Sequence, residues 1–283
     1  MMRYDAAPME GLTDRVWRQA HQRWFGGADR YYAPFLSPPE NRIPIKKKMA
    51  ELAPEANPGA PVIPQLLGKD GSCAAWMIGV LRDLAALDRF LDTVFTEAGG
   101  PISVKTRIGV ERPEEFGAIL EVYNRYPLAE LIVHPRVMRQ LYRGQADRDA
   151  FEAALPACKA PVCYNGDITA PEDFAALAAR WPGLAGLMAG RGLIADPALL
   201  RRARGGPAAS KEELRGYFAE LYAGYTAAFG SPQAAISRMK AHWHEAAGLF
   251  EGSDKLAKQL KKLRDPWEYE VTVGQLFTLP LRK

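Results

Sequence analysis

The sequence is poor in the residues that hold secreted, metal-binding and membrane proteins together. It has three cysteines, Cys73, Cys158 and Cys163, with no CxxC pair and no cysteine–histidine spacing typical of a metal site. We therefore expect no disulfide framework and no metal. The longest apolar stretches, such as residues 184–189, are too short to cross a bilayer, and Asp5, Glu10 and Asp14 occupy the place of a signal-peptide core. We expect a cytoplasmic protein without a membrane segment.

The chain is long enough for one large core and a small appendage. It has 283 residues, of which 48% are hydrophobic, and a formal net charge of +4. This modest excess of cations permits a polyanionic partner without requiring one.

Residues 4–204 alternate between short apolar segments and amphipathic ones, which is the pattern of repeated βα units around a parallel sheet. Helices are expected at residues 13–25, with Thr13 as the N-cap, and at residues 113–126 and 171–181. Seven strands are expected, at residues 4–8, 30–35, 61–67, 101–107, 130–134, 161–165 and 184–189.

One segment interrupts this alternation. Apolar residues recur from residue 74 to residue 98 without a turn signal, which predicts a single helix about twice the usual crossover length of 10–15 residues. Two helices joined after the loss of a strand would give this pattern. Seven strands plus one make eight, so we predict a TIM-barrel-like (β/α)8 fold with one βα unit deleted.

The alternation stops after the Gly205-Gly206-Pro207 segment. Residues 211–230, 231–249 and 253–263 have only helical periodicity and carry many cations. We therefore divide the chain into a barrel domain of residues 1–205 and a C-terminal, all-helical domain of residues 210–283.

Polar residues follow most of the predicted strands, where the reactive groups of a barrel enzyme lie. Each of them alone could be a solvated or structural residue, but their repetition at the same end of successive strands favours a site. They are Glu10, Gln65, Lys105, Arg107, His134, Asn165 and Arg191. The glycines beside Arg191 and the nearby Asn165-Gly166-Asp167 turn suggest a phosphorylated cofactor.

Six motifs occur in the order found in one enzyme family. They are Ala-Pro-Met-Glu-Gly-Leu-Thr-Asp (7–14), Pro-Gln-Leu-Leu-Gly (64–68), Ser-Val-Lys-Thr-Arg-Ile-Gly (103–109), Val-His-Pro-Arg (133–136), Tyr-Asn-Gly-Asp-Ile (164–168) and Met-Ala-Gly-Arg-Gly (188–192). In these motifs the chain resembles the tRNA-dihydrouridine synthases. Barrels of the dihydroorotate dehydrogenase type share part of the lysine and glycine pattern, but the opening motif favours the synthases.

The resemblance implies an FMN-dependent oxidoreductase that reduces uridine to dihydrouridine in tRNA, with NADPH as the reductant. It implies that Pro8 and Met9 lie against the flavin, that Gln65 and Lys105 bond to its ring system and that His134 sits beside it. It implies that Asn165, Gly190 and Arg191 bind the ribityl phosphate. Gly166 and Asp167, in the same turn as Asn165, complete the residues predicted to bind the cofactor.

The helical domain is the expected tRNA-binding part of what we take to be a monomer. Its Arg-Met-Lys-Ala-His-Trp stretch again resembles the family. The residues assigned to RNA are Arg238, Lys240, His242, Lys258 and Lys261. On its own, residues 255–263 would also fit any solvated amphipathic helix.

In the family the proton-donating cysteine lies in an Asn-x-Gly-Cys-Pro stretch at the end of a strand, and nothing between Gly68 and Ser103 matches this stretch. The gap falls near Leu84, where the strand count is also one short. No catalytic residue is therefore assigned. A tRNA-binding relative without reductase activity stays open as an alternative, and so does an FMN oxidoreductase of small molecules.

Overall fold

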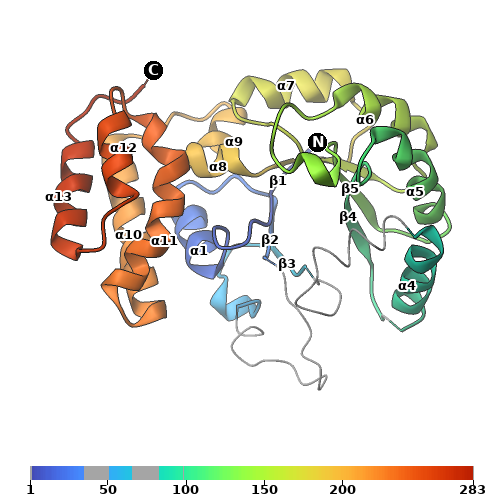
Figure 1. Cartoon of the computed structure of the whole chain (residues 1–283), viewed down its shortest axis with the longest axis horizontal. Coiled ribbons are helices and arrows are strands. Elements are labelled where there is room, and N and C mark those ends of the chain that lie inside the picture. The colour runs from blue at the N-terminus through green and yellow to red at the C-terminus, as the bar shows by residue number, and fades with distance from the viewer. Residues whose placement is uncertain (1, 35–50, 66–82, 98, 283) are drawn as a thin grey trace.

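A computed structural model of the chain describes residues 2–34, 51–65, 83–97 and 99–282. Within them, seven parallel strands form one sheet in the order β3-β2-β1-β7-β6-β5-β4 (Figure 1). The strands are β1 (Arg3–Ala6), β2 (Arg30–Tyr32), β3 (Val62–Ile63), β4 (Ser103–Arg107), β5 (Glu130–His134), β6 (Val162–Tyr164) and β7 (Gly186–Ala189). All seven predicted strands are confirmed, several of them shorter than expected.

The sheet is curled, as the contacts of Glu130 demonstrate. In a flat sheet the four strand spacings between β2 and β5 would put them roughly 19 Å apart. The Tyr32 hydroxyl nevertheless donates to the Glu130 carboxylate at 3.1 Å, and Arg3 of β1 and Arg30 of β2 form ion pairs with the same carboxylate. The strands therefore enclose an interior like that of a TIM barrel, and β3 and β4 are the two ends of the sheet over the described residues.

The barrel helices largely follow the predicted pattern. They are α1 (Arg15–Trp24), α4 (Leu84–Glu97), α5 (Phe116–Tyr123), α6 (Arg148–Ala154), α7 (Pro171–Arg180), α8 (Arg191–Ala195) and α9 (Leu199–Ala203). One boundary was wrong: Asp14, not Thr13, caps α1, because its carboxylate accepts from the amide of Trp17 at 3.2 Å. The Thr13 hydroxyl instead accepts from the amide of Met9 at 2.7 Å.

The expectation of one helix through residues 74–98 is wrong at Asp83. Helix α4 begins at Leu84, and the Asp83 side chain accepts from the amide of Ala86 at 2.9 Å, as an N-cap does. Residues 74–82 lie outside the described residues. The position where a lost strand was inferred, near Leu84, is therefore helical.

From Lys211 onward the chain is almost entirely helical, as expected. The helices are α10 (Lys211–Phe229), α11 (Pro232–Ala246), α12 (Asp254–Leu260) and α13 (Pro266–Leu276), of which α13 was not predicted. A capping box of Ser210 and Glu213 starts α10, and Gly230 ends it in the left-handed conformation. These helices lie side by side at one end of the molecule (Figure 1).

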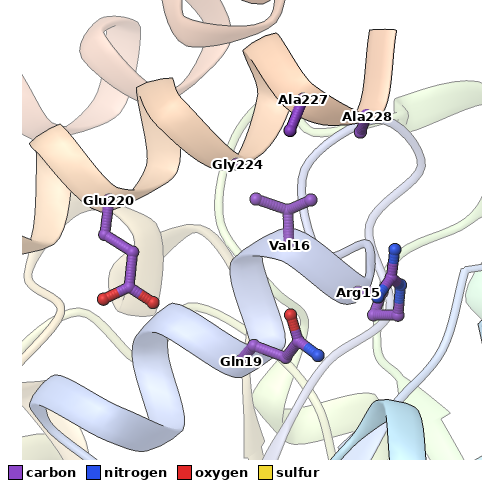
Figure 2. Close-up of a pocket in the computed structure, with 7 residues that line it drawn as sticks. All are labelled: Arg15, Val16, Gln19, Glu220, Gly224, Ala227 and Ala228. Atoms are coloured by element: carbon purple, nitrogen blue, oxygen red, sulfur yellow. The ribbon is translucent and has the colours of Figure 1, made fainter.

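Helix α10 packs closely on α1 because two of its residues are glycines. A Cβ atom on Gly224 would come within 2.7 Å of Val16, and one on Gly216 would overlap the Trp24 ring. Figure 2 shows Val16 of α1 pointing toward Gly224 and Ala227 of α10, beside a surface depression of about 310 Å3. No helix among the described residues is long and apolar enough to span a membrane, and these residues hold no cluster that could bind a metal ion.

Candidate active site at the carboxyl ends of the strands

A cavity of about 260 Å3 opens where β1, β4, β5, β6 and β7 end. This is the end of a barrel at which active sites form. Nine of the ten residues predicted to hold a cofactor line it: Pro8, Met9, Lys105, His134, Asn165, Gly166, Asp167, Gly190 and Arg191. They come from five different strands and the loops that follow them. The polar residues that recur at the same end of the predicted strands therefore do meet in one site.

The cavity is electropositive. Lys105 forms no hydrogen bond or ion pair with another described residue, and burial, followed by the nearby Arg107, lowers its pKa to about 8. Burial and then the surrounding cations, Lys105 first among them, lower the pKa of His134 to about 2. Lys105 is therefore mainly charged at neutral pH, whereas His134 is neutral.

The tautomer of the His134 ring follows from the one hydrogen bond that its side chain forms with a described residue. Nη1 of Arg136 lies 3.1 Å from Nε2 of His134, and a guanidinium can only donate. Nε2 is therefore the acceptor, and the proton of the neutral ring sits on Nδ1. His134 can offer an N–H donor to a ligand in the cavity and cannot supply a positive charge.

Asp167 organises the cations of the cavity. Its backbone φ of 40° is left-handed, a conformation that Asp tolerates better than most residues. Its carboxylate accepts from Arg136 at 2.5 Å, from the amide of Ala146 at 2.7 Å and from Arg191 at 3.4 Å. A carboxylate repels a phosphate, so Asp167 acts by orienting Arg136 and Arg191.

The last two motifs provide space and free acceptors. Nδ2 of Asn165 donates to the carbonyl of Met188 at 2.8 Å, which leaves its Oδ1 available on the cavity wall. A Cβ atom on Gly190 would come 3.5 Å from Sδ of Met9, so a larger residue there would fill the space against the β1 loop. Helix α8 has only five residues, so an anion at this point would depend chiefly on Arg191.

Gln65 is the predicted cofactor residue that the structure does not place on the cavity wall. It lies just beyond β3, and its Oε1 is buried without a hydrogen-bond partner among the described residues. Neither described cysteine lines the cavity: Cys163 is fully buried beneath it in the barrel interior and Cys158 is half-buried. Cys73 lies outside the described residues.

Three charged or aromatic residues of the cavity wall were not predicted. Arg136 is 1% exposed and bridges His134 and Asp167. Tyr142 is 55% exposed at the mouth, with the guanidinium of Arg191 4.7 Å from its ring centre. Glu245 reaches the cavity from α11 and forms no hydrogen bond or ion pair with another described residue. The aromatic ring in a basic loop could have marked Tyr142, but no local pattern marks Glu245.

The residues assigned to RNA have three different environments. The prediction for His242 is wrong, because its side chain is 1% exposed and Nε2 lies 3.0 Å from the hydroxyl of Tyr225. Arg238 is half-buried and donates to the carbonyl of Gly11. Lys240 is half-buried, whereas Lys258 and Lys261 are exposed. For these four residues, RNA contact stays a prediction.

Fold and site together define a barrel protein with a cationic cavity, suited to a ligand that carries an anionic group. The chain belongs to the dihydrouridine synthase (Dus) family, whose model matches residues 77–278. The matched range includes the Lys105, His134, Asn165 and Arg191 motifs and the C-terminal helices. The motifs at residues 7–14 and 64–68 precede it.

Named relatives agree with this membership. The chain is 26% identical to tRNA-dihydrouridine synthase B of Pseudomonas aeruginosa, over 96% of this chain and 91% of the relative. It is 27% identical to tRNA-dihydrouridine(16) synthase of Cupriavidus necator, over 92% and 95%. These alignments run over 311 and 314 residues, more than the 283 of this chain, so each relative has insertions relative to it.

Other matches are partial or distant. A 32% match to tRNA-dihydrouridine synthase B of Pseudomonas putida spans 43% of this chain and 36% of that protein. Among solved structures, the old yellow enzyme from Trypanosoma cruzi is 10% identical, with a TM-score of 0.48 over 79% of this chain and 93% of that one. A likeness at this level carries no functional assignment.

Proposed function

We propose that the chain is an FMN-dependent oxidoreductase that reduces uridine to 5,6-dihydrouridine in tRNA, with NADPH as the reductant. The observation that carries the proposal is the meeting of nine predicted cofactor residues, from five separate motifs, in one electropositive cavity. Membership of the dihydrouridine synthase family supports the same reaction.

The residues of the cavity fit FMN. Pro8 and Met9 offer an apolar surface to a flat ring, and the unpartnered Lys105 offers a charged donor. Arg191, steered by Asp167, is the cation for a terminal phosphate. Bound FMN would supply the hydride that the reduction of a uracil ring requires.

Lys105 and His134 differ in charge and therefore act differently on a bound ring. With a pKa of about 8, Lys105 carries a positive charge at neutral pH and stabilises negative charge on a reduced ring beside it. His134 stays neutral and donates through Nδ1, so it orients a ligand carbonyl without adding charge. Tyr142, exposed at the mouth between two arginines, offers a platform on which an extruded base can stack.

The proposal gives each part of the chain a task. Residues 1–205 hold the flavin, and residues 210–283 hold folded RNA through Lys258 and Lys261, which are exposed cations. We further propose that the protein works as a monomer in the cytoplasm, where tRNA and NADPH are found.

A second function, tRNA binding without reduction, is favoured by one observation. No cysteine among the described residues lines the cavity, so the described site offers no thiol acid to protonate the reduced base. General-acid catalysis typically contributes ~10²- to 10⁴-fold, so the reaction would be slow with water as the donor.

The test combines flavin binding with product analysis. We would titrate the purified chain with FMN, following the visible spectrum, and then assay dihydrouridine in tRNA that lacks the modification. Lys105→Met is expected to weaken FMN binding by about 10- to 100-fold, the value of a hydrogen bond to a charged group. Lys159→Met removes an exposed lysine outside the cavity and is the matched control.

The outcomes separate the candidates. FMN binding with NADPH-dependent dihydrouridine formation supports the reductase. FMN-independent, salt-sensitive tRNA binding without product supports the binding protein. Equal FMN affinity of Lys105→Met and the parent would contradict the assignment of the cavity.

A further inference from the structure

Arg238, in the basic stretch of α11, points into the protein. Its Nη1 donates to the carbonyl of Gly11, in the loop that follows β1, and its Nε lies 4.0 Å from Oδ2 of Asp14. The guanidinium also lies over the rings of Tyr225 and Phe229, at 5.9 and 5.6 Å from their centres. Its contacts thus join the helical part of the chain to the first loop of the barrel.

A second connection runs through three side chains. The Tyr225 hydroxyl lies 3.0 Å from Oδ1 of Asp14 and 3.0 Å from Nε2 of His242. Because the hydroxyl has one proton and the carboxylate can only accept, Tyr225 donates to Asp14 and accepts from Nε2–H of His242. The unprotonated Nδ1 of His242 then remains as a buried acceptor without a partner among the described residues.

These contacts hold a compact loop. The carbonyl of Met9 accepts from the amides of Leu12 and Thr13, both at 3.0 Å, and the amide of Met9 donates to the Thr13 hydroxyl. Gly11 and Asp14 fasten the far end of this loop to α10 and α11. Its near end carries Pro8 and Met9 on the cavity wall.

Gly11 lets Arg238 reach the loop. Its φ of +74° favours glycine, and a Cβ atom would come 2.5 Å from Nη1 of Arg238. Helix α11 also packs against α8, which begins with Arg191, and contributes Glu245 to the cavity. One helix therefore contacts the β1 loop through Arg238, packs against α8 and contributes Glu245 to the cavity.

We infer that Arg238, Tyr225 and His242 are positioning residues of the barrel cavity: they fix the β1 loop, and with it Pro8 and Met9, from the helical part of the chain. Arg238 and His242 then serve the cofactor site and not the RNA. The proposed function enters only in naming FMN as the ligand of that cavity.

The primary test is amide hydrogen exchange of Leu12 and Thr13 in the flavin-free protein, which does not depend on the proposed function. Arg238→Met is expected to speed exchange of both amides at least tenfold and to weaken FMN binding by a similar factor. Arg238→Lys, which can still donate to Gly11, should restore part of the protection from exchange and part of the FMN affinity. Lys240→Met removes the same charge two residues away on α11 and should change neither.

Tyr225→Phe provides a second variant, since it keeps the ring and removes only the hydroxyl. It should speed the same exchange less than Arg238→Met does, and it decides the question if Arg238→Met does not fold. The inference is overturned if every variant that folds exchanges these amides like the parent. It is also overturned if Arg238→Met lowers tRNA affinity and the salt dependence of that affinity while exchange in the loop is unchanged. If the parent binds no FMN, the proposed function fails but the exchange result still decides the positioning role.

Discussion

Helices α11 and α12 both carry several basic residues, but these residues differ in how far they are buried. Both belong to the basic C-terminal region, and both supplied predicted RNA contacts. In α11, His242 and Trp243 are each 1% exposed, and Arg238 bonds to the barrel. In α12 and the turn after it, Lys258 and Lys261 are exposed. Basic composition alone therefore does not distinguish an RNA-binding surface from a buried contact between the C-terminal helices and the barrel.

Helical phase explains the difference. The buried residues of α11 recur at three- and four-residue spacing, so His242 falls on the buried stripe: Ala235, Ile236, Met239, His242, Trp243 and Ala246. Around α12 the buried Leu260 and Leu263 lie on one side and the exposed Lys255, Lys258 and Lys262 on the other. A polar residue in phase with an apolar stripe is a candidate for an internal hydrogen bond.

The largest effect should come from Trp243, one of the two tryptophans of this region. Trp243 stacks on Phe218 at 4.0 Å and donates to the Tyr269 hydroxyl at 2.9 Å. Trp243→Ala is expected to lower the free energy of unfolding by about 3–5 kcal/mol in urea titrations. Trp267→Ala, which removes a ring that is 72% exposed, should change it by less than ~0.5 kcal/mol. Similar losses for the two variants would contradict the assigned burial.

A pH titration of stability tests His242. Burial lowers its pKa to about 3 from 6.5, so the unfolded chain binds the proton first and stability is lost as pH falls from 6.5 toward 3. The loss of stability caused by His242 should be on the order of 3 kcal/mol at pH 4 and absent above pH 7. His21 and His134 act in the same direction, so the measured quantity is the difference between the parent and His242→Gln. His244→Gln, on the exposed face of α11, is the control.

The smallest effect on stability, and the clearest on RNA, is expected for α12. Lys258→Ala with Lys261→Ala should change stability by less than ~0.5 kcal/mol. If both lysines meet phosphates, the slope of log affinity against log salt should fall in magnitude by about 1–2. Arg238→Met should leave that slope unchanged. An unchanged slope in the double variant would mean that neither lysine contacts a phosphate of the RNA.

Much of the fold could be predicted because the βα alternation is a strong local signal. Seven strands were found, and Pro171 marked the start of a helix correctly. The 74–98 segment was read wrongly because the N-cap at Asp83 lies among apolar residues with helical spacing. Helix α13 was missed because Pro266 begins it so soon after the basic stretch.

The candidate site was predictable as far as strand ends determine it. Lys105, His134, Asn165 and Arg191 lie within or just beyond the carboxyl-terminal halves of four strands and meet, because the carboxyl ends of parallel strands lie at one edge. Glu245 could not be found in this way, since its position depends on how α11 packs against the barrel. Gln65 illustrates the opposite case: it follows a strand, but it is not among the residues that line the cavity, and its Oε1 is buried without a partner among the described residues.

The carboxylate of Glu130 restricts how this protein can change by single mutations. It is 3% exposed and meets Arg3, Arg30 and Tyr32, while burial raises the pKa of nearby Asp5 to about 6. Removing one member of such a network leaves its partners uncompensated, which costs several kcal/mol, whereas replacing the whole set with apolar residues can be neutral. Variation at the base of the barrel should therefore be concerted, with β1, β2 and β5 changing together.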